Sequence, residues 1–291
     1  MEKVVYALSG ATAVSACVAA WAVYKWVCTR SALRAYTHVY TDAREVQRYL
    51  EHHYGSLADL SELKDIVPEE AVDYQRRLAD FCGVACERWQ VAKDRVLDVG
   101  CGPGGLSFHL SRHFRQVIGT DISYEMITAA QTLKQFGEFA VSFPSEGGNH
   151  VSFHSIRVPD DSSRERVEFW DEDACALAYT CGTFDCVVAS NVLTVMYDPK
   201  SFLQDIHRYV TNGGLLVVGD AYDWKSGPEV LLGGWGEMMT PTLLRNILES
   251  SWSLVEETSM AYYVPRCRRL AIIGNAHFTI WKKKQDDDSQ D

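Results

Sequence analysis

The residues best suited to bind a hydroxyl-bearing ligand lie between positions 98 and 121. The stretch VLDVGCGPGG (96–105) is an apolar run that leads into Gly100, Gly102 and Gly104. Glycines let a ligand approach the backbone closely, so this pattern predicts a strand, a binding turn and a helix. Asp98 precedes the glycines, and Asp121 ends the next apolar run, where an acid can accept hydrogen bonds from ribose. Gly105 also completes G-x-G-x-x-G, so the glycines alone leave a nicotinamide-type Rossmann domain open.

The elements around this turn alternate between apolar runs and helical patterns. Five runs predict strands (95–100, 116–121, 166–173, 184–192 and 213–222), and helices are expected at 106–113, 124–136 and 200–210. Such alternation is typical of an α/β fold with a doubly wound parallel sheet. A helix at 241–250 and two closing antiparallel strands, 252–258 and 270–281, follow.

The combined motifs resemble those of class I S-adenosylmethionine-dependent methyltransferases. DVGCGPG matches their first motif, Asp121 their ribose-binding acid, and Asp173-Ala174 the pair beside the adenine. Ser190-Asn191 matches the strand end that faces the transferable methyl group, and GGLLVV (213–218) matches their fifth strand. The resemblance implies a Rossmann-like sheet of seven strands with helices on both faces, and S-adenosyl-L-methionine as cofactor. The implied cofactor-binding residues are Asp98, Gly100, Gly102, Gly104, Asp121, Ile122, Asp173, Ala174 and Asn191.

Four further stretches (40–55, 190–203, 219–235 and 268–283) resemble the C-terminal mercaptohistidine N-methyltransferase domain of ovothiol-biosynthesis enzymes. That resemblance implies methylation of the imidazole of a histidine-derived small molecule such as 5-thiohistidine. The sequence departs from the family in two ways. An apolar segment stands where the family has an iron-dependent sulfoxide synthase, and GCGPGG replaces a GCAVGR-like loop. Another imidazole or a small amine therefore stays open as the substrate.

Methyl transfer needs an aligned nucleophile and an acceptor for its proton, but no metal. The catalytic candidates are Asn191, Tyr222 and Tyr54, and other side chains expected near the methyl group are His53, Tyr197 and Trp224. Each has a structural alternative, because asparagine often bonds local backbone and large aromatic residues fill cores. We expect His277 to be a core residue. The arginines at 266, 268 and 269 either bind a substrate carboxylate or lie in a solvated loop.

The N-terminal segment Val4–Tyr24 contains no charged residue and is long enough to span a bilayer. Aromatic residues at its ends and basic residues after it predict a single-pass membrane anchor over residues 1–28, with the catalytic domain facing the cytosol. A signal peptide or a buried helix are the alternatives. Residues 29–94 are expected to form an N-terminal helical cap, with helices at 45–54, ending at Gly55, and at 69–90.

Residues 95–284 form the expected methyltransferase domain. Within it, the polar segment 137–164 is expected to be a long connection and a possible lid. The charged tail 285–291 is expected to be disordered.

The amino-acid composition limits the kinds of molecule that the protein is expected to bind. There are 28 Lys and Arg against 39 Asp and Glu, a net charge of −11, and this acidity argues against nucleic-acid binding. Nine scattered cysteines indicate a reducing compartment, and their spacing does not predict a zinc site. We therefore expect a small-molecule substrate, with methylation of a protein or lipid at a membrane as the alternative. A non-catalytic scaffold is disfavoured by the intact acid and glycine set, and the oligomeric state is left open.

Overall fold

The computed structural model describes residues 42–56, 62–146, 150–177, 181–224, 232–233 and 238–285. The chain divides into two compact units, residues 1–39 and 40–291, and all described residues belong to the second. The predicted anchor (1–28) therefore lies outside the described residues, as do most of the tail and the beginning of the helical cap. Among the helices that the structure describes, none is both long enough and apolar enough to cross a bilayer.

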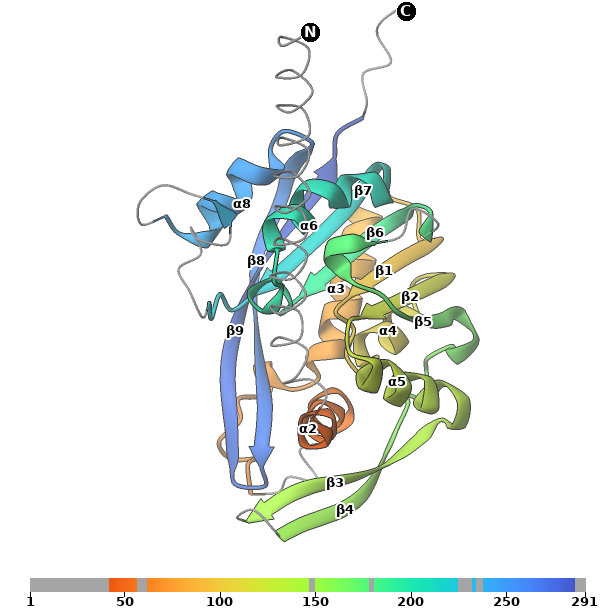
Figure 1. The fold of residues 1–291 in the computed structure, drawn as a ribbon, viewed down its shortest axis with the longest axis vertical. Coiled ribbons are helices and arrows are strands. Elements are labelled where there is room, and N and C mark those ends of the chain that lie inside the picture. The colour runs from red at the N-terminus through yellow and green to blue at the C-terminus, as the bar shows by residue number, and fades with distance from the viewer. Residues whose placement is uncertain are drawn as a thin grey trace, which may run out of the picture. The chain divides into compact units, whose positions relative to one another are not determined.

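A mixed sheet of seven strands forms the centre of the second unit, in the order β5-β2-β1-β6-β7-β9-β8 (Figure 1). The strands β5, β2, β1, β6 and β7 are parallel neighbours, and β9 runs antiparallel to both β7 and β8. This confirms the predicted parallel sheet with an antiparallel closing pair, although β8 and β9 are longer than expected. Their bounds are β1 Arg95–Val99, β2 Gln116–Asp121, β5 Val167–Asp171, β6 Phe184–Ser190, β7 Val210–Asp220, β8 Trp252–Cys267 and β9 Leu270–Lys283.

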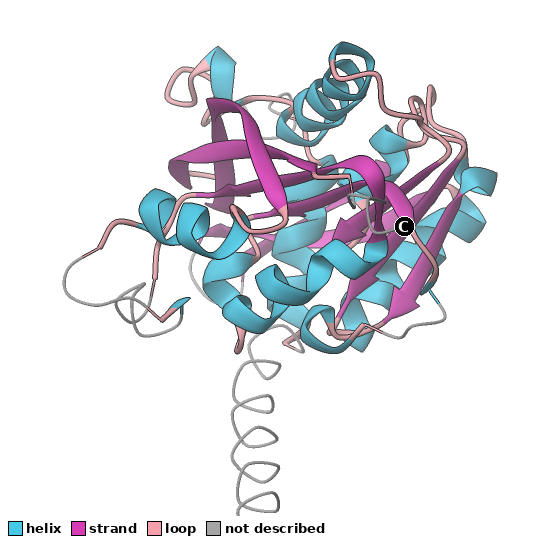
Figure 2. Cartoon of the chain, turned by 90° about the horizontal axis from the view of Figure 1, so that it is seen from above, coloured by secondary structure: helices cyan, strands magenta, loops and turns pink. Residues whose placement is uncertain are grey.

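Helices cover both faces of this sheet (Figure 2). One face packs against α3 (Tyr74–Arg88), α4 (Gly105–Leu110) and α5 (Tyr124–Phe136), and the other against α6 (Pro199–Asp205) and α8 (Thr240–Leu248). Successive strand residues alternate between the two faces, so Val217 belongs to the first core and Val218 to the second. Short 3₁₀ turns complete the described elements: η1 Glu69–Ala71, η2 Arg164–Arg166, η3 Ala174–Ala176, η5 Leu193–Val195 and η6 Ile206–Tyr209.

The helix α2 (Ala43–Tyr54) brings the first site residues to the sheet. Its N-cap is Asp42, whose carboxylate accepts a hydrogen bond from the backbone N–H of Arg44, and the helix packs against β3, β4 and β8. The predicted end at Gly55 is confirmed, but Gly55 has an extended backbone with φ −65° and not the left-handed one of a C′ glycine. Glycine is suited to this position because a Cβ atom there would collide with Glu51.

The predicted helix 69–90 is broken, which corrects the sequence interpretation. A 3₁₀ turn ends at Ala71, Val72 is extended, and Asp73 has the left-handed φ of 52°. Only then does α3 begin, at Tyr74. The apolar spacing on either side of the break is helical, so periodicity could not reveal it. The break places Tyr74 at the first turn of α3, beside the carboxyl end of β6.

The segment 137–164 is also not the unstructured connection that its polarity suggested. It forms a two-stranded hairpin, β3 (Glu138–Glu146) and β4 (His150–Arg157), which buries Val141, Phe143 and Ile156 against α2 and α5. The backbone N–H of Arg268, in the β8–β9 turn, donates to Pro144 at 3.1 Å. Both hairpins reach toward α2 in Figure 1. A role of this segment as a lid stays a prediction.

Candidate active site

The turn after β1 is shaped by its glycines. Gly100, Gly102 and Gly104 have φ values of 69°, 53° and 87°, the left-handed region that side chains disfavour. A Cβ atom on Gly100 would lie 2.5 Å from the side chain of Val192, and one on Gly104 would lie 2.5 Å from the ring of Phe169. Only glycine fits these two positions, and the backbone N–H groups of Gly100 and Gly104 are bonded within the chain, to Thr120 and Cys101.

Two carboxylates flank this turn. Asp98 is buried and accepts a hydrogen bond from the Ser107 hydroxyl at 2.6 Å, and burial raises its pKa to about 7. Asp121 accepts the backbone N–H of Gly102 and that of Ser123, both at 2.9 Å. Burial also raises the pKa of Asp121. Asp121 therefore ties the end of β2 to the glycine turn, and its carboxylate has acceptor capacity left for a ligand hydroxyl. Ile122 follows it, half-buried.

The third predicted acid caps a short turn. Asp173 accepts the backbone N–H of Cys175 at 2.9 Å and the hydroxyl of Tyr197 at 2.7 Å. The Tyr197 hydroxyl, predicted near the methyl group, is thus engaged with the acid that the motifs assign to the adenine. Ala174 follows Asp173 and lines a cavity of about 200 Å³.

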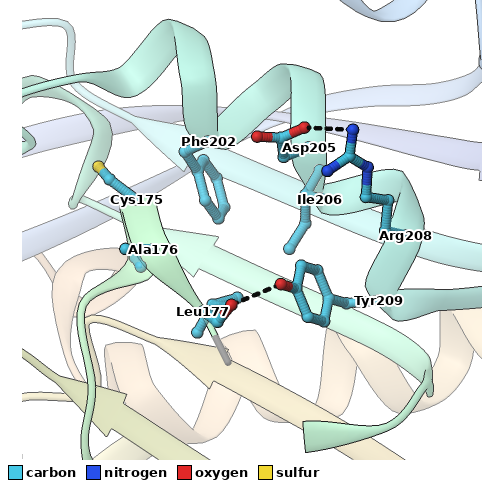
Figure 3. A pocket seen from close by; sticks show the side chains of 9 residues that line it. Cys175, Ala176, Leu177, Phe202, Asp205, Ile206, Arg208 and Tyr209 are labelled. Atoms are coloured by element: carbon cyan, nitrogen blue, oxygen red, sulfur yellow. Dashed lines mark hydrogen bonds and ion pairs between the residues drawn. The ribbon is translucent and has the colours of Figure 1, made fainter. Parts of the chain in front are cut away.

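This cavity lies between η3 and the segment α6–η6 (Figure 3). Arg208 pairs with Asp205 at 3.2 Å, and the Tyr209 hydroxyl donates to the Leu177 carbonyl at 2.6 Å. No residue of the glycine turn lines it. The cavity therefore adjoins the predicted cofactor residues only at Ala174 and is not where methyl transfer would occur.

The carboxyl end of β6 holds Asn191 in a strained conformation with φ 51°. Its backbone N–H donates to Gly219 at 2.7 Å, and its Nδ2 donates to the Tyr74 hydroxyl at 3.0 Å. That hydroxyl also shares a hydrogen bond with Ser190 Oγ at 2.8 Å. The remaining oxygen, Asn191 Oδ1, is buried and has no hydrogen-bond partner within the described part of the chain. A non-glycine residue held at positive φ is typical of functional sites.

Tyr74 belongs to a cluster of aromatic rings that was not predicted from the sequence. The His52 ring stacks on Tyr74 with centroids 6.5 Å apart, and Tyr262 lies 5.4 Å from Tyr74. Burial lowers the pKa of His52 to about 4, so its imidazole is neutral at physiological pH. A backbone bond to Tyr263 engages the ring, while Nδ1 is buried and unpartnered among the residues described. We call His52, Tyr74, Asn191 and Tyr262 the polar-aromatic wall.

The other two residues at the end of α2 support the glycine turn. His53 Nδ1 accepts the backbone N–H of Gly105 at 3.2 Å, and burial lowers its pKa so that it stays neutral. The Tyr54 hydroxyl donates to the Pro103 carbonyl at 2.7 Å. Tyr54, a predicted catalytic residue, therefore braces the turn through its hydroxyl, and a direct role in methyl transfer stays a prediction.

Tyr222 stands at the carboxyl end of β7, again with a left-handed φ of 59°. Its backbone N–H donates to the buried Asp220, and its hydroxyl lies 2.9 Å from His277 Nδ1. His277, expected to be a core residue, is half-buried and paired with this predicted catalytic side chain, which corrects that expectation. Trp224 donates its ring N–H to Thr240 at 2.9 Å, which favours its structural alternative.

The predicted residues thus gather at one edge of the sheet, the carboxyl ends of β1, β2, β5, β6 and β7, where open α/β sheets bind their ligands. Of the three arginines near the end of β8, Arg266 belongs to that strand and contributes to the lowered pKa of His52. Arg268 pairs with Glu62 at 3.2 Å, so its guanidinium is already engaged with a carboxylate of the chain and is not available for the carboxylate of a substrate. Within the described ranges, no group of three or more His, Cys, Asp or Glu side chains could hold a metal ion.

Comparisons with known proteins agree with this geometry. Residues 97–218, which span the glycine turn through β7, match the family model described as a methyltransferase domain. Residues 97–218 therefore match a methyltransferase domain, and S-adenosylmethionine is the methyl donor of that enzyme class.

The relatives act on several kinds of molecule. A ubiquinone biosynthesis O-methyltransferase of Bradyrhizobium diazoefficiens is 27% identical over 58% of this chain and 62% of its own. A 2-methyl-6-phytyl-1,4-hydroquinone methyltransferase of Synechocystis is 26% identical over 70% of this chain and 54% of its own. Both alignments therefore leave more than a third of the relative unmatched. The solved N-methyltransferase NodS from Bradyrhizobium japonicum is 16% identical over 74% of this chain and 99% of its own, with a TM-score of 0.46.

The residues present fit S-adenosylmethionine. The glycine turn carries no side chain at its strained positions, so a ligand can approach its backbone closely, and the carboxylates of Asp98 and Asp121 suit a ligand that carries hydroxyl and ammonium groups. The motif residues that would hold the cofactor are Asp98, Gly100, Gly102, Gly104, Asp121, Ile122, Asp173, Ala174 and Asn191.

Proposed function

We propose that this chain is an N-methyltransferase that acts on the imidazole of a histidine-derived small molecule, with 5-thiohistidine as the trial acceptor. The four stretches that resemble mercaptohistidine N-methyltransferase domains support this choice. Three of them include residues of the site: Tyr54 in the first, Asn191 in the second and Tyr222 in the third. When bound, S-adenosylmethionine supplies an electrophilic methyl group, and its sulfur keeps the electron pair of the bond that breaks.

The polar-aromatic wall is the observation that carries the proposal. It presents two buried hydrogen-bond acceptors, His52 Nδ1 and Asn191 Oδ1, that have no partner among the described residues. Leaving such a group unsatisfied costs about 1–3 kcal/mol, so a ligand that donates to both recovers that free energy. A donor-bearing ligand is therefore favoured over a purely apolar one.

A flat heterocycle suits the same wall. The rings of His52, Tyr74 and Tyr262 lie 5.4–6.5 Å apart, and their faces favour planar or cationic groups. A histidine-derived molecule has a ring N–H and an α-ammonium group, which supply two kinds of donor and a planar ring. The chemistry of the wall thus agrees with the family resemblance.

The test uses the full-length chain in detergent with S-adenosylmethionine that carries a deuterated methyl group. We expect mass spectrometry to show one deuterated methyl on 5-thiohistidine, and fragmentation to place it on the imidazole. Tyr74→Phe should reduce turnover, while Tyr262→Phe, whose hydroxyl makes no hydrogen bond to the other three wall residues, is the matched control. Intact binding of S-adenosylhomocysteine without any methylated 5-thiohistidine would refute the proposed substrate.

A second candidate is O-methylation of a phenolic ring. It is favoured by the two relatives named for ubiquinone and hydroquinone methylation. A phenol also offers a planar ring and an O–H donor, so the wall does not exclude it. Replacing 5-thiohistidine by a prenylated catechol in the same assay separates the two, because the mass of the methylated product identifies the acceptor.

We also propose that residues 1–28 anchor the chain in a membrane with the methyltransferase domain in the cytosol, as the apolar segment and its basic flank indicate. Methylation of a protein or lipid substrate at that membrane is the alternative that this location would favour. Full-length chain should pellet with membranes and resist carbonate extraction, and a chain lacking residues 1–28 should not. Release of the full-length chain by carbonate would contradict the anchor. Radiolabelled cofactor added to membranes would label macromolecules only under the alternative.

A further inference from the structure

A line of polar side chains leads from the edge of the site toward solvent. The Tyr222 hydroxyl lies 2.9 Å from His277 Nδ1, and His277 Nε2 lies 3.8 Å from Glu257 Oε1. Arg245, on α8, donates to both oxygens of Glu257 at 2.9 Å. These residues come from four elements: the end of β7, then β9, β8 and α8.

The hydrogen-bond directions along this line follow from the chemistry of its members. Burial and the nearby Asp220 and Glu257 raise the pKa of Tyr222, so its phenol keeps its proton at neutral pH. If the Tyr222 O–H donates to His277 Nδ1, the imidazole proton must be on Nε2, the nitrogen that faces Glu257. The carboxylate is then placed to stabilise a positive charge on His277.

Resting on the proposed function, we infer that Tyr222 and His277 form a proton relay for methyl transfer, with Glu257 as the residue that orients the imidazole. The methyl acceptor loses its N–H or O–H proton to the Tyr222 oxygen as the Tyr222 proton passes to His277 Nδ1. The resulting imidazolium, stabilised by Glu257, then releases a proton to water, and proton exchange with water restores the Nε2–H tautomer before the next turnover. One proton leaves for each methyl group transferred, so charge and atoms balance.

The backbone presents Tyr222 for this task. Tyr222 has a left-handed φ of 59°, and its N–H is held by Asp220, whose carboxylate also accepts the backbone N–H of Thr194. Asn191 lies at the end of the adjacent strand β6 and is bonded to Gly219, so both strained residues sit at one edge. Strain at two neighbouring strand ends is costly, and it persists where function requires the conformation.

The outer end of the line reaches solvent. The side chain of His277 is 28% exposed and that of Glu257 is 39% exposed, so a proton on the imidazole can pass to water. Asp220 on β7 and Ser259 on β8 lie opposite His277 in register.

The tautomer of His277 tests the relay without any methyl acceptor. The full-length chain is labelled with ¹⁵N-histidine, and His277→Asn identifies the His277 signals in a long-range ¹H–¹⁵N spectrum. We expect the Nε2–H tautomer at pH above 8, and its population should fall in Glu257→Gln. An Nδ1–H tautomer would overturn the relay, because Nδ1 could then not accept the Tyr222 proton.

Turnover provides the second test. In His277→Asn the amide oxygen can still accept a hydrogen bond from Tyr222 but cannot take up a proton. We expect kcat with 5-thiohistidine to fall about 100-fold or more, the usual size of a general-base effect. KM and the affinity for S-adenosylhomocysteine should change little. His207→Asn, at a half-buried histidine on η6 away from this line, controls for the substitution itself.

The size of the change in kcat separates proton transfer from mere positioning. If His277→Asn keeps kcat within threefold, His277 only holds Tyr222 and the relay is refuted. If wild-type chain methylates no 5-thiohistidine although the Nε2–H tautomer is found, the proposed substrate fails while the relay is supported.

Discussion

Replacing Gly104 by alanine tests whether the glycine turn is shaped by steric necessity. Gly104 has φ 87°, and an added Cβ would lie 2.5 Å from Cζ of Phe169 and 3.3 Å from Cβ of Ala130. The left-handed conformation costs an L-residue about 1–2 kcal/mol, and forcing a methyl group into a packed interior costs about 1–3 kcal/mol. We therefore expect Gly104→Ala to lower the free energy of unfolding by about 2–5 kcal/mol.

Gly102 provides a matched control two residues away. It has φ 53°, so alanine there bears similar backbone strain, but its Cβ would contact only the His53 ring, at 3.5 Å. The expected loss for Gly102→Ala is therefore about 1–2 kcal/mol, and the difference between the two variants measures the Phe169 contact. Urea denaturation followed by circular dichroism gives both free energies at one pH.

A double-mutant cycle decides whether Phe169 is responsible. In a Phe169→Leu background the aromatic Cζ is gone, so the cost of Gly104→Ala should approach that of Gly102→Ala. Equal losses for the two glycine variants in the wild-type background, or an unchanged cost of Gly104→Ala in the Phe169→Leu background, would refute the steric argument.

Three further outcomes are expected. The pKa of buried Asp98 is raised to about 7, so the folded chain binds a proton there that the unfolded chain has lost, and stability falls as pH rises from about 4 to 7. We expect the free energy of unfolding of the wild type to fall between pH 5 and pH 8 by about 2–3 kcal/mol more than that of Asp98→Asn, which has no proton to lose at this position. Urea denaturation at the two pH values measures both losses, and equal losses would contradict the burial argument. Tyr74→Phe leaves Asn191 Nδ2 without its acceptor and should lower the unfolding free energy by about 1–3 kcal/mol, whereas Tyr262→Phe should cost less. Asp121→Asn keeps only one acceptor oxygen for two backbone N–H groups and a ligand hydroxyl. We therefore expect calorimetry to show that S-adenosylhomocysteine binds about tenfold or more weakly. An unchanged affinity would show that Asp121 does not belong to the site.

Local patterns were sufficient for the sheet and for the glycine turn that the motifs assign to the cofactor. The helix predicted at 124–136 coincides with α5, and the strands around Asp98, Asp121 and Asn191 lie where their apolar runs placed them. Long apolar runs bounded by glycine or acid form buried parallel strands in almost any context, so these elements need little information from the rest of the chain. The prediction of one continuous helix over 69–90 was wrong because the spacing of apolar residues gives no sign of a single extended residue such as Val72.

The hairpin β3–β4 escaped prediction for a related reason. Its alternation is short and interrupted by Ser, Gly and Asn, and its buried side chains acquire an apolar environment only when α2 packs on them. Stability in such a hairpin comes from tertiary burial more than from its own residues.

The sequence by itself determined the α/β class, the glycine turn and its acids, and hence the methyl donor, because these depend on residues close together in the chain. Only the tertiary structure decided the partners of those residues. Tyr74 and Asn191 are 117 positions apart, and Tyr222 and His277 are 55 apart. The physical reason is that side-chain hydrogen bonds of this kind depend on how the helices and strands pack. The order of residues in a single sequence does not show which distant residues come into contact.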